Sequence, residues 1–319
     1  MAILIGKRIL GALIVLLALS ALIFFAGTLL PGDVAEAQLG QYATPEALQA
    51  LREELGLDIP VMDRYIQWLT GMLHGDWGLS VATRVPVSDL LNERLGNTAL
   101  LAAASAAIAV PLAIIIGIVT VLNRGAFSDR LSTVILLMCS STPEFLIATA
   151  AVLMLSVHLG WLPAVSYIDP GTSWPRLVQM LVLPVSVLVL HVTAQMARMT
   201  RATLINLMHQ PYVEMAALKG LSRARQIIWH ALPNGIGPIA NVVALNVAYM
   251  VSGVVVVETI FAYPGLSRLM IDAVTARDMP VVAACAMIFS AAYVVLMLIA
   301  DIIALVANPR LRRADPSRT

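Results

Sequence analysis

The sequence predicts an all-α polytopic membrane protein with about six transmembrane helices, both termini inside the cell, a helical cap outside and a helical loop inside. Hydrophobic residues make up 60% of the 319 residues and charged residues only 12%, whereas about a quarter of a soluble domain is charged. Apolar windows of about 20 residues, long enough to cross the hydrocarbon core, recur along the chain. The uneven distribution of Lys and Arg over the intervening segments gives the orientation.

Six apolar windows are the predicted spans, and they cover residues 9–30, 95–122, 131–155, 177–197, 236–257 and 281–306. The second, fourth and fifth windows contain no charged residue, whereas the third contains Glu144 and the sixth contains Asp301. The run Ser140-Ser141-Thr142-Pro143 precedes Glu144 and predicts a break or kink in the third helix, where the freed backbone groups need other partners.

The first window has an alternative interpretation as a secretory signal. Lys7 and Arg8 precede it, and Ala35-Glu36-Ala37 resembles a cleavage site. The apolar region of a signal is only about 7–15 residues long, whereas this window is much longer. We therefore expect an uncleaved first helix.

The orientation follows from the positive-inside bias of Lys and Arg. With the N-terminus inside, most of the 20 basic residues fall in cytoplasmic segments, and the long first outer loop is rich in acidic residues. The inverted topology would place most basic residues outside. The sequence therefore predicts both termini in the cytoplasm.

The outer loop, residues 31–94, is too long for a simple connection and contains two predicted helices. The first begins with Thr44 as N-cap and Pro45 in its first turn, and it ends at Gly56. The second covers residues 61–73 and carries Tyr65 and Trp68 on its apolar side. We expect a small cap that docks an outside partner; the alternative is an interfacial segment without a partner, since Trp and Tyr favour the interface.

Several classes of function have no support in the sequence. It contains no phosphate-binding loop, so ATP and Mg are not expected to bind this chain. The five His residues are scattered without metal-site spacing, and Cys139 and Cys285 lie inside apolar windows, where small core residues are expected. No basic patch interleaved with aromatic residues predicts binding to nucleic acid. We expect no catalytic residues, no metal site and no cofactor in this chain.

A polar, helix-forming insert separates the fourth and fifth windows. It contains Glu214, Ala216, Ala217 and Gly220 in the spacing Glu-x-Ala-Ala-x-x-x-Gly and closes at Leu232-Pro233. This insert resembles the cytoplasmic loop by which permease subunits of ATP-binding-cassette importers contact their ATPase subunits.

Motifs along nearly the whole chain extend the resemblance to the oligopeptide, dipeptide and nickel branch of these permeases. In order, they are Leu29-Leu30-Pro31-Gly32-Asp33, Leu55-Gly56-Leu57-Asp58-Ile59-Pro60, Gly75-Asp76-Trp77-Gly78-Leu79-Ser80, Leu218-Lys219-Gly220-Leu221-Ser222, Val257-Glu258-Thr259-Ile260-Phe261, Pro264-Gly265-Leu266, Arg277-Asp278-Met279-Pro280 and Asn308-Pro309-Arg310-Leu311-Arg312. Any one of these motifs is weak evidence for the resemblance, whereas their order and spacing together are highly specific for this branch.

The resemblance implies a heteromeric importer of the bacterial inner membrane. Its other parts would be a second homologous permease, two ATPases that bind ATP and Mg, and an extracytoplasmic substrate-binding protein. The residues implied to contact the ATPases are Glu214, Ala216, Ala217, Gly220, Ser222, Arg223 and Arg225. Gly220 permits a turn between two short helices, and Ser222 is expected to cap the second.

The expected domain layout follows. Residues 1–30 form a tail and the first span, 31–94 the outer cap, 95–310 the transmembrane core with the coupling loop 198–233, and 311–319 a cytoplasmic tail.

Polar residues within the spans are candidates for a translocation path, because charges there are costly and usually functional. The path candidates are Ser140, Ser141, Thr142, Glu144, Ser186, His191, Thr193 and Gln195. Candidates for an outer gate or a structural role are Glu258, Arg277, Asp278 and Asp301. For Glu144, Glu258 and Asp301 a structural pairing and a substrate role both stay open, and Asp301 is close enough to the inner end of its helix to pair with a cytoplasmic Arg.

The resemblance thus implies a transport subunit that moves solutes by alternating access and performs no chemistry itself. A stand-alone secondary transporter and an intramembrane enzyme are the alternatives. Permeases for peptides, nickel and metal chelates share the motifs, so the substrate is open among these classes. The short segment 160–176 is slightly nearer the nickel-type pattern.

Overall fold

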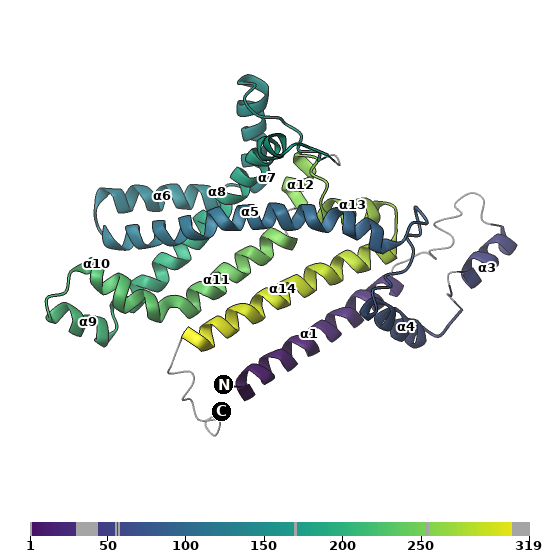
Figure 1. Cartoon of the computed structure of the whole chain (residues 1–319), viewed down its shortest axis with the longest axis horizontal. Helices are drawn as coiled ribbons and strands as arrows, with labels where there is room; N and C mark the ends of the chain where they lie inside the picture. Colours follow the sequence, from purple (N-terminus) through teal and green to yellow (C-terminus); the bar gives the residue numbers. More distant parts are fainter. Residues whose placement is uncertain are drawn as a thin grey trace. The chain divides into compact units, whose positions relative to one another are not determined.

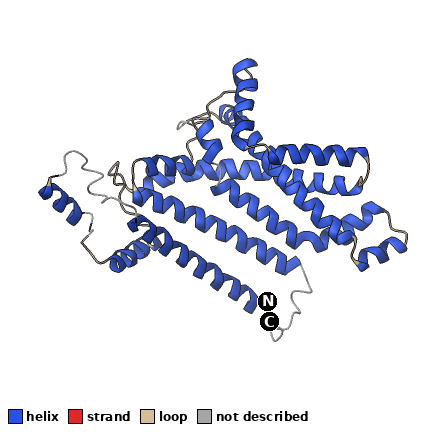
Figure 2. Cartoon of the chain, turned by 180° about the vertical axis from the view of Figure 1, so that it is seen from behind, coloured by secondary structure: helices blue, strands red, loops and turns tan. Residues whose placement is uncertain are grey.

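The structure, a computed structural model, describes residues 2–29, 44–54, 56, 58–168, 171–252 and 255–307. Figure 2 shows that the described chain consists of helices joined by loops, without β-strands. Its one recorded β-contact is an isolated antiparallel bridge between Leu79 and Pro86. The predicted tail 311–319 and the motifs at 30–33 and 308–312 lie outside the described residues.

Two compact units divide the chain. Unit 1 contains Met1–Ala12, Ala99–Pro264 and Ala292–Thr319, and unit 2 contains Leu13–Thr98 and Gly265–Ala291. The fold is described unit by unit below.

Five helices of the described chain are long and apolar enough to cross a membrane, and a bent helix pair makes a sixth candidate. The five are α1 (Ala2–Leu29), α5 (Val87–Leu122), α8 (Trp174–Met208), the run Arg223–Ile260 that includes α11 (Leu232–Ser252) and α12 (Val255–Ile260), and α14 (Met279–Ala307). Each contains one of the predicted windows or most of it. The all-α polytopic class is therefore confirmed.

The third predicted span is broken rather than straight. It consists of α6 (Phe127–Ser141), α7 (Glu144–Ala151) and the π-helical η2 (Val152–His158), with a bend of 96° between Phe127–Ser141 and Glu144–His158. Thr142 has ψ 127°, because the ring of the following Pro143 disfavours helical geometry in the preceding residue. The predicted break at Pro143 is confirmed, and the two parts together make the third candidate span.

Unit 1 is built around α8, which contributes a large share of its buried apolar side chains. Helices α6, α7 and α11 pack against α8 (Figure 1). Small residues allow the closest approaches: a Cβ on Gly117 of α5 would lie 2.7 Å from Thr200 Cγ2 of α8, and one on Gly235 of α11 would lie 3.0 Å from Leu207 Cδ1. The contacts of α5 and α11 with the C-terminal part of α8 therefore depend on glycine.

Unit 2 contains the predicted outer helices, α3 (Pro45–Glu54) and α4 (Val61–Leu73). The Thr44 hydroxyl accepts a hydrogen bond from the Ala47 amide at 3.3 Å, and Gly56 has φ +63°, so the predicted cap and terminator are both present.

Helix α4 packs on α1 through aromatic rings. The ring centroids of Phe24 and Trp68 are 5.5 Å apart, and the Ser20 and Tyr65 hydroxyls are hydrogen bonded at 2.9 Å. The apolar side predicted for this helix is therefore the side that binds α1.

Sequence analysis missed α13 (Leu266–Thr275), an amphipathic helix of unit 2. It begins directly after Pro264-Gly265, and its first amide, that of Leu266, donates to the Thr98 hydroxyl at 2.8 Å. The segment between the fifth and sixth windows is thus structured.

Candidate functional site

The insert between α8 and α11 folds into two short helices joined by a turn. They are α9 (Pro211–Leu218) and α10 (Arg223–Arg225), and the π-helical η3 (Gln226–Ala231) connects α10 to α11 (Figure 1). Pro211 occupies the start of α9, where its fixed φ suits a helix and its missing amide hydrogen costs nothing. The predicted coupling loop, 198–233, is therefore shorter than expected: residues 198–208 belong to α8, and residues 232–233 begin α11.

Gly220 closes α9 with a Schellman turn. Its amide donates to the Ala217 carbonyl at 2.9 Å, and the Leu221 amide donates to the Ala216 carbonyl at 3.2 Å. Gly220 has φ +78°, a left-handed conformation that side chains with a Cβ disfavour. A Cβ at this position would meet nothing within 4 Å, so conformation rather than space requires the glycine.

The predicted contact residues of this loop do not all face the same way. Ala216 is buried, whereas Ala217 and Glu214 are exposed, so only one of the two small residues belongs to the internal packing. Arg223 and Arg225 are exposed on α10. Ser222 holds the N-cap position, but its side chain makes no capping hydrogen bond, so the expected capping role is wrong in this respect.

The loop also exposes large apolar side chains. Leu218 is 82% exposed, Trp229 71% and Met215 54%. Arg223 and Arg225 are exposed as well, so the loop presents both apolar and basic side chains. Exposed large apolar side chains at a loop are typical of a contact with another protein.

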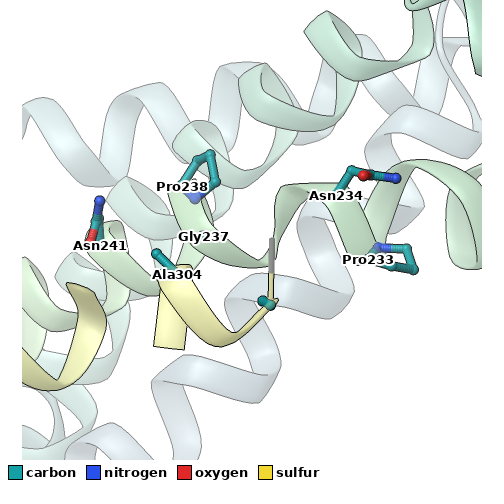
Figure 3. Close-up of a pocket in the computed structure, with 7 residues that line it drawn as sticks. Pro233, Asn234, Gly237, Pro238, Asn241 and Ala304 are labelled. Carbon is teal, nitrogen blue, oxygen red and sulfur yellow. The ribbon is translucent and has the colours of Figure 1, made fainter. Parts of the chain in front are cut away.

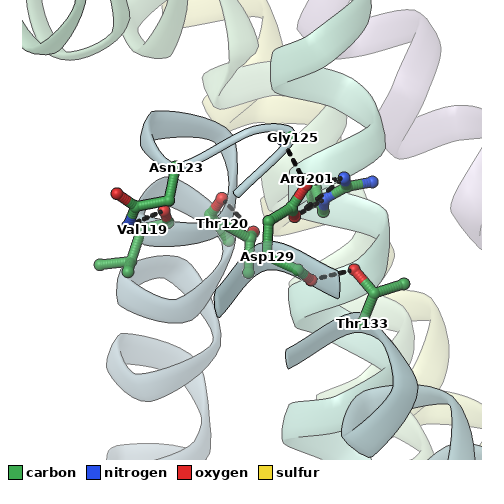
Figure 4. A network of polar contacts seen from close by, with 8 residues as sticks. Val119, Thr120, Asn123, Gly125, Asp129, Thr133 and Arg201 are labelled. Carbon is green, nitrogen blue, oxygen red and sulfur yellow. Dashed lines mark hydrogen bonds and ion pairs between the residues drawn. The ribbon is translucent and has the colours of Figure 1, made fainter. Parts of the chain in front are cut away.

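A buried ion pair connects α6 to α8 (Figure 4). Asp129, in the first turn of α6, receives hydrogen bonds from Arg201 of α8, with Nε and Nη2 lying 3.2 and 3.0 Å from Oδ1. The Gly125 amide donates to Oδ2 at 3.1 Å, and the side chains of Asp129 and Arg201 are only 7% and 24% exposed. The α5–α6 turn is thereby fixed to α8. Arg124 of the same turn contacts His209, next to α9, at 3.4 Å.

Sequence analysis missed Asp129. It falls between the second and third windows, where only the basic residues were weighed, and its partner is 72 residues away. A signal was present: an acidic residue between Arg124 and Arg130, four residues after a glycine, is a candidate for capping a helix start.

Three polar side chains meet at the α6–α7 break. Glu144 begins α7, is 7% exposed, and accepts a hydrogen bond through Oε2 from the Tyr249 hydroxyl of α11 at 2.7 Å. The His191 ring of α8 lies 6.3 Å from the Tyr249 ring. Sequence analysis missed Tyr249, which lies in a window without charged residues.

The other path candidates do not join this cluster. Ser140 accepts a hydrogen bond from Arg198 at 2.9 Å, and Thr142 and Ser186 donate to carbonyls of their own helices or caps. Thr193 is buried with no hydrogen-bond partner for its hydroxyl among the described residues, whereas Ser141 and Gln195 are exposed. The predicted path residues thus fall into separate groups.

Two of the residues predicted for an outer gate or a structural role, Glu258 and Asp301, belong to unit 1. Glu258 of unit 1 is fully buried. Burial, and then the neighbouring Glu258, raise the pKa of Tyr263 above its usual range, so its phenol stays protonated. Asp301 forms an ion pair with Arg8 at 2.8 Å, the kind of pairing that was predicted.

In unit 2, Asp278 accepts hydrogen bonds from the Ser80 hydroxyl and from the Val81 amide, the latter at 3.1 Å. Arg277 has φ +54°, an uncommon conformation for a residue with a side chain. These contacts connect the loop before α5 to the start of α14.

Two cavities of unit 1 lie along α11 and α14. One of about 340 Å³ is lined by Pro233, Asn234, Gly237, Pro238, Asn241, Ala304 and Ala307 (Figure 3). The other, of about 460 Å³, has an almost wholly apolar lining that includes Ile236, Val243 and Ile299. Within the described chain no group of three or more His, Cys, Asp or Glu residues is arranged to hold a metal ion.

Comparisons with known proteins match nearly the whole chain. The family described as binding-protein-dependent transport system inner membrane component matches residues 109–313, and the family described as the N-terminal part of such membrane components matches residues 1–102. A putative peptide transport system permease protein of Brucella abortus (strain 2308) is 37% identical over 315 residues, covering 98% of this chain and 99% of the relative. The glutathione transport system permease protein GsiC of Escherichia coli (strain K12) is 34% identical over 306 residues, covering 96% and 97%.

Proposed function

Because this chain belongs to the binding-protein-dependent transport system inner membrane components, we propose that it moves peptides into the cytoplasm by alternating access, driven by ATP hydrolysis in partner subunits. The chain itself is a multi-pass inner membrane protein and a transport subunit rather than an enzyme. The named relatives serve peptide and glutathione transport, which supports a peptide as cargo. Nickel or a metal chelate is the second candidate, and only the short segment 160–176 favours it.

The observation that carries the proposal is the coupling segment, residues 211–231. It combines exposed apolar and basic side chains with a Schellman turn at Gly220. The adjoining turn between α5 and α6 is fixed to α8 by the Asp129–Arg201 pair. Arg124 of that turn contacts His209 just before the segment, so the movement of an attached ATPase can pass to α8 and α11 as a rigid-body motion.

The complete importer would contain this chain, a second permease, two ATPases that bind ATP and Mg, and an outer binding protein. In this arrangement both termini and the coupling segment face the cytoplasm, consistent with the positive-inside bias. The path would run beside α6, α7, α8 and α11 at the interface with the second permease. Without its binding protein, the permease pair is expected to bind substrate no more tightly than about millimolar, roughly −4 kcal/mol.

Replacement of Gly220 tests the coupling role. Gly220→Val places a β-branched residue at a φ of +78°, which costs about 1–2 kcal/mol locally and displaces the turn. In proteoliposomes that contain the whole importer, we expect peptide-stimulated ATP hydrolysis to fall about tenfold.

Gly220→Asn is the matched control, because asparagine tolerates the left-handed conformation. It should keep most of the activity, and both variants should assemble with the second permease as judged by size-exclusion chromatography. Wild-type ATP hydrolysis and peptide uptake in the Gly220→Val complex would refute the coupling role.

A further inference from the structure

The buried carboxyl group of Glu144 lacks a partner on one oxygen. Oε2 accepts from Tyr249, but Oε1 is buried without a hydrogen-bond partner among the described residues. A buried polar atom without a partner costs free energy, and an ionisable group within a span is usually functional. The unpartnered oxygen therefore points to a ligand that donates a hydrogen bond.

His191 adds a second buried atom without a partner. Its Nδ1 has no hydrogen-bond partner in the described part of the chain, and its ring centroid lies 6.3 Å from that of Tyr249. Tyr249 thus contacts both Glu144 and His191 and connects the start of α7 to α8 through α11. Thr193 does not join them, because residues two apart on a helix point in different directions.

The atoms of this cluster that are left to bind a ligand are hydrogen-bond acceptors. The Tyr249 proton is donated to Glu144, which leaves lone pairs on the phenol oxygen, and Glu144 Oε1 is an acceptor. His191 Nδ1 is an acceptor when the ring proton is on Nε2. A primary ammonium group has three N–H donors and a positive charge, and it also favours the face of an aromatic ring.

We propose that Glu144, Tyr249 and His191 bind the primary ammonium group of a peptide's N-terminus during its passage through the membrane. The inference rests on the proposed function for the identity of the cargo, and the site itself rests on the contacts above. Binding at this cluster is transient, since Glu144 Oε2 already accepts a hydrogen bond from the Tyr249 hydroxyl and only Oε1 is left for the cargo. A lysine of the second permease is the competing occupant.

Transport of two peptides that differ only in the amino group tests the site. The whole importer in proteoliposomes is supplied with trialanine or with N-acetyl-trialanine, which has no ammonium group. For each peptide, uptake by a variant is divided by wild-type uptake, so any discrimination by the binding protein cancels. We expect Glu144→Gln to lower trialanine uptake about tenfold and to change N-acetyl-trialanine uptake less than about twofold.

Matched variants separate binding from folding. The Gln side chain can still accept the Tyr249 hydrogen bond, and Glu144→Asp keeps the charge and should retain the preference for trialanine in part. Thr149→Val, an exposed change on the same helix, should affect neither peptide, because the Thr149 hydroxyl only donates to the Phe145 carbonyl. Equal effects of Glu144→Gln on both peptides, or loss of the second permease from the complex, would overturn the proposal.

A direct binding measurement tests the ammonium site independently of the proposed peptide transport. If the wild-type importer takes up neither peptide, the proposed function fails, whereas the site is still tested with ethylammonium as the probe. Saturation-transfer NMR should detect ethylammonium on the purified wild-type complex and lose the signal in Glu144→Gln. A signal of equal size in both, or none in the wild type, would overturn the site.

Discussion

Two ion pairs of unit 1 show why a short distance does not identify the more important contact. Arg8 and Asp301 join the start of α1 to the end of α14 at 2.8 Å, whereas Asp129 and Arg201 approach to 3.0 Å. The side chains of the first pair are 56% and 29% exposed, and those of the second are 24% and 7% exposed. The longer contact is thus the more buried one.

The number of hydrogen bonds separates the pairs further. Arg201 reaches both carboxylate oxygens of Asp129, and the Gly125 amide adds another donor, whereas a single Arg8 nitrogen reaches Asp301. Bidentate geometry and burial both raise the contribution of a charged contact, and solvent lowers that of an exposed pair. The buried pair fixes the turn next to the coupling segment, and the exposed pair only joins two helix ends.

The largest effect is expected from removing one partner of the buried pair. Asp129→Ala leaves the Arg201 guanidinium and the Gly125 amide without their acceptor. Breaking a buried pair in this way costs about 3–5 kcal/mol, and the partial exposure of Arg201 places this case near the lower value. We expect a lower unfolding temperature of the purified importer, followed by the fluorescence of a thiol-reactive dye during heating.

Arg201→Lys is the companion to this experiment. It keeps the charge but not the two-nitrogen fork, so it should destabilise the protein less than Asp129→Ala does. An unfolding temperature within one degree of wild type for Asp129→Ala would show that the network of Figure 4 contributes little to stability.

The next largest effect concerns the packing that brings the buried pair together. Thr200 precedes Arg201 on α8, and a Cβ on Gly117 of α5 would lie 2.7 Å from Thr200 Cγ2. Gly117→Val would therefore overfill this contact, with an expected cost of about 1–3 kcal/mol in unfolding free energy. The same heating experiment measures it.

Gly11→Val is the control, because a Cβ on Gly11 meets nothing within 4 Å. The double variant Gly117→Val with Thr200→Ala should recover part of the loss if the clash is its cause. No recovery in the double variant would assign the loss to a change of the helix itself rather than to the contact between α5 and α8.

The two pairs also separate what the sequence could predict from what it could not. Asp301 is a lone charge near the end of an apolar window, so pairing with a basic residue was predictable from its position. Gly220 was predictable as well, since the helix end and the glycine are adjacent in the sequence. Local patterns likewise predicted the bounds of α4 and the break at Pro143.

Contacts between distant segments were not predictable. The partner of Asp129 is 72 residues away, and that of Glu144 is 105 residues away, in a window without charges. Helix α13 was missed because its ten residues follow a Pro-Gly turn and are too short to form an apolar window. The candidate site depends on which helices pack together, and a single sequence contains no direct record of that packing.

The smallest effect is expected at the exposed pair and should depend on salt. Asp301→Asn removes the charge that Arg8 contacts, and an exposed pair contributes about 1 kcal/mol or less because water and ions screen it. At about 0.1 M salt the screening length is about 10 Å, and at about 1 M it is about 3 Å. The difference in unfolding temperature between wild type and Asp301→Asn should therefore shrink as salt is raised, whereas the difference for Asp129→Ala should persist. The contrary result would be a change in unfolding temperature for Asp301→Asn that persists at about 1 M salt and equals the change for Asp129→Ala. It would show that the Arg8–Asp301 pair is shielded from solvent and that the two pairs do not differ in burial.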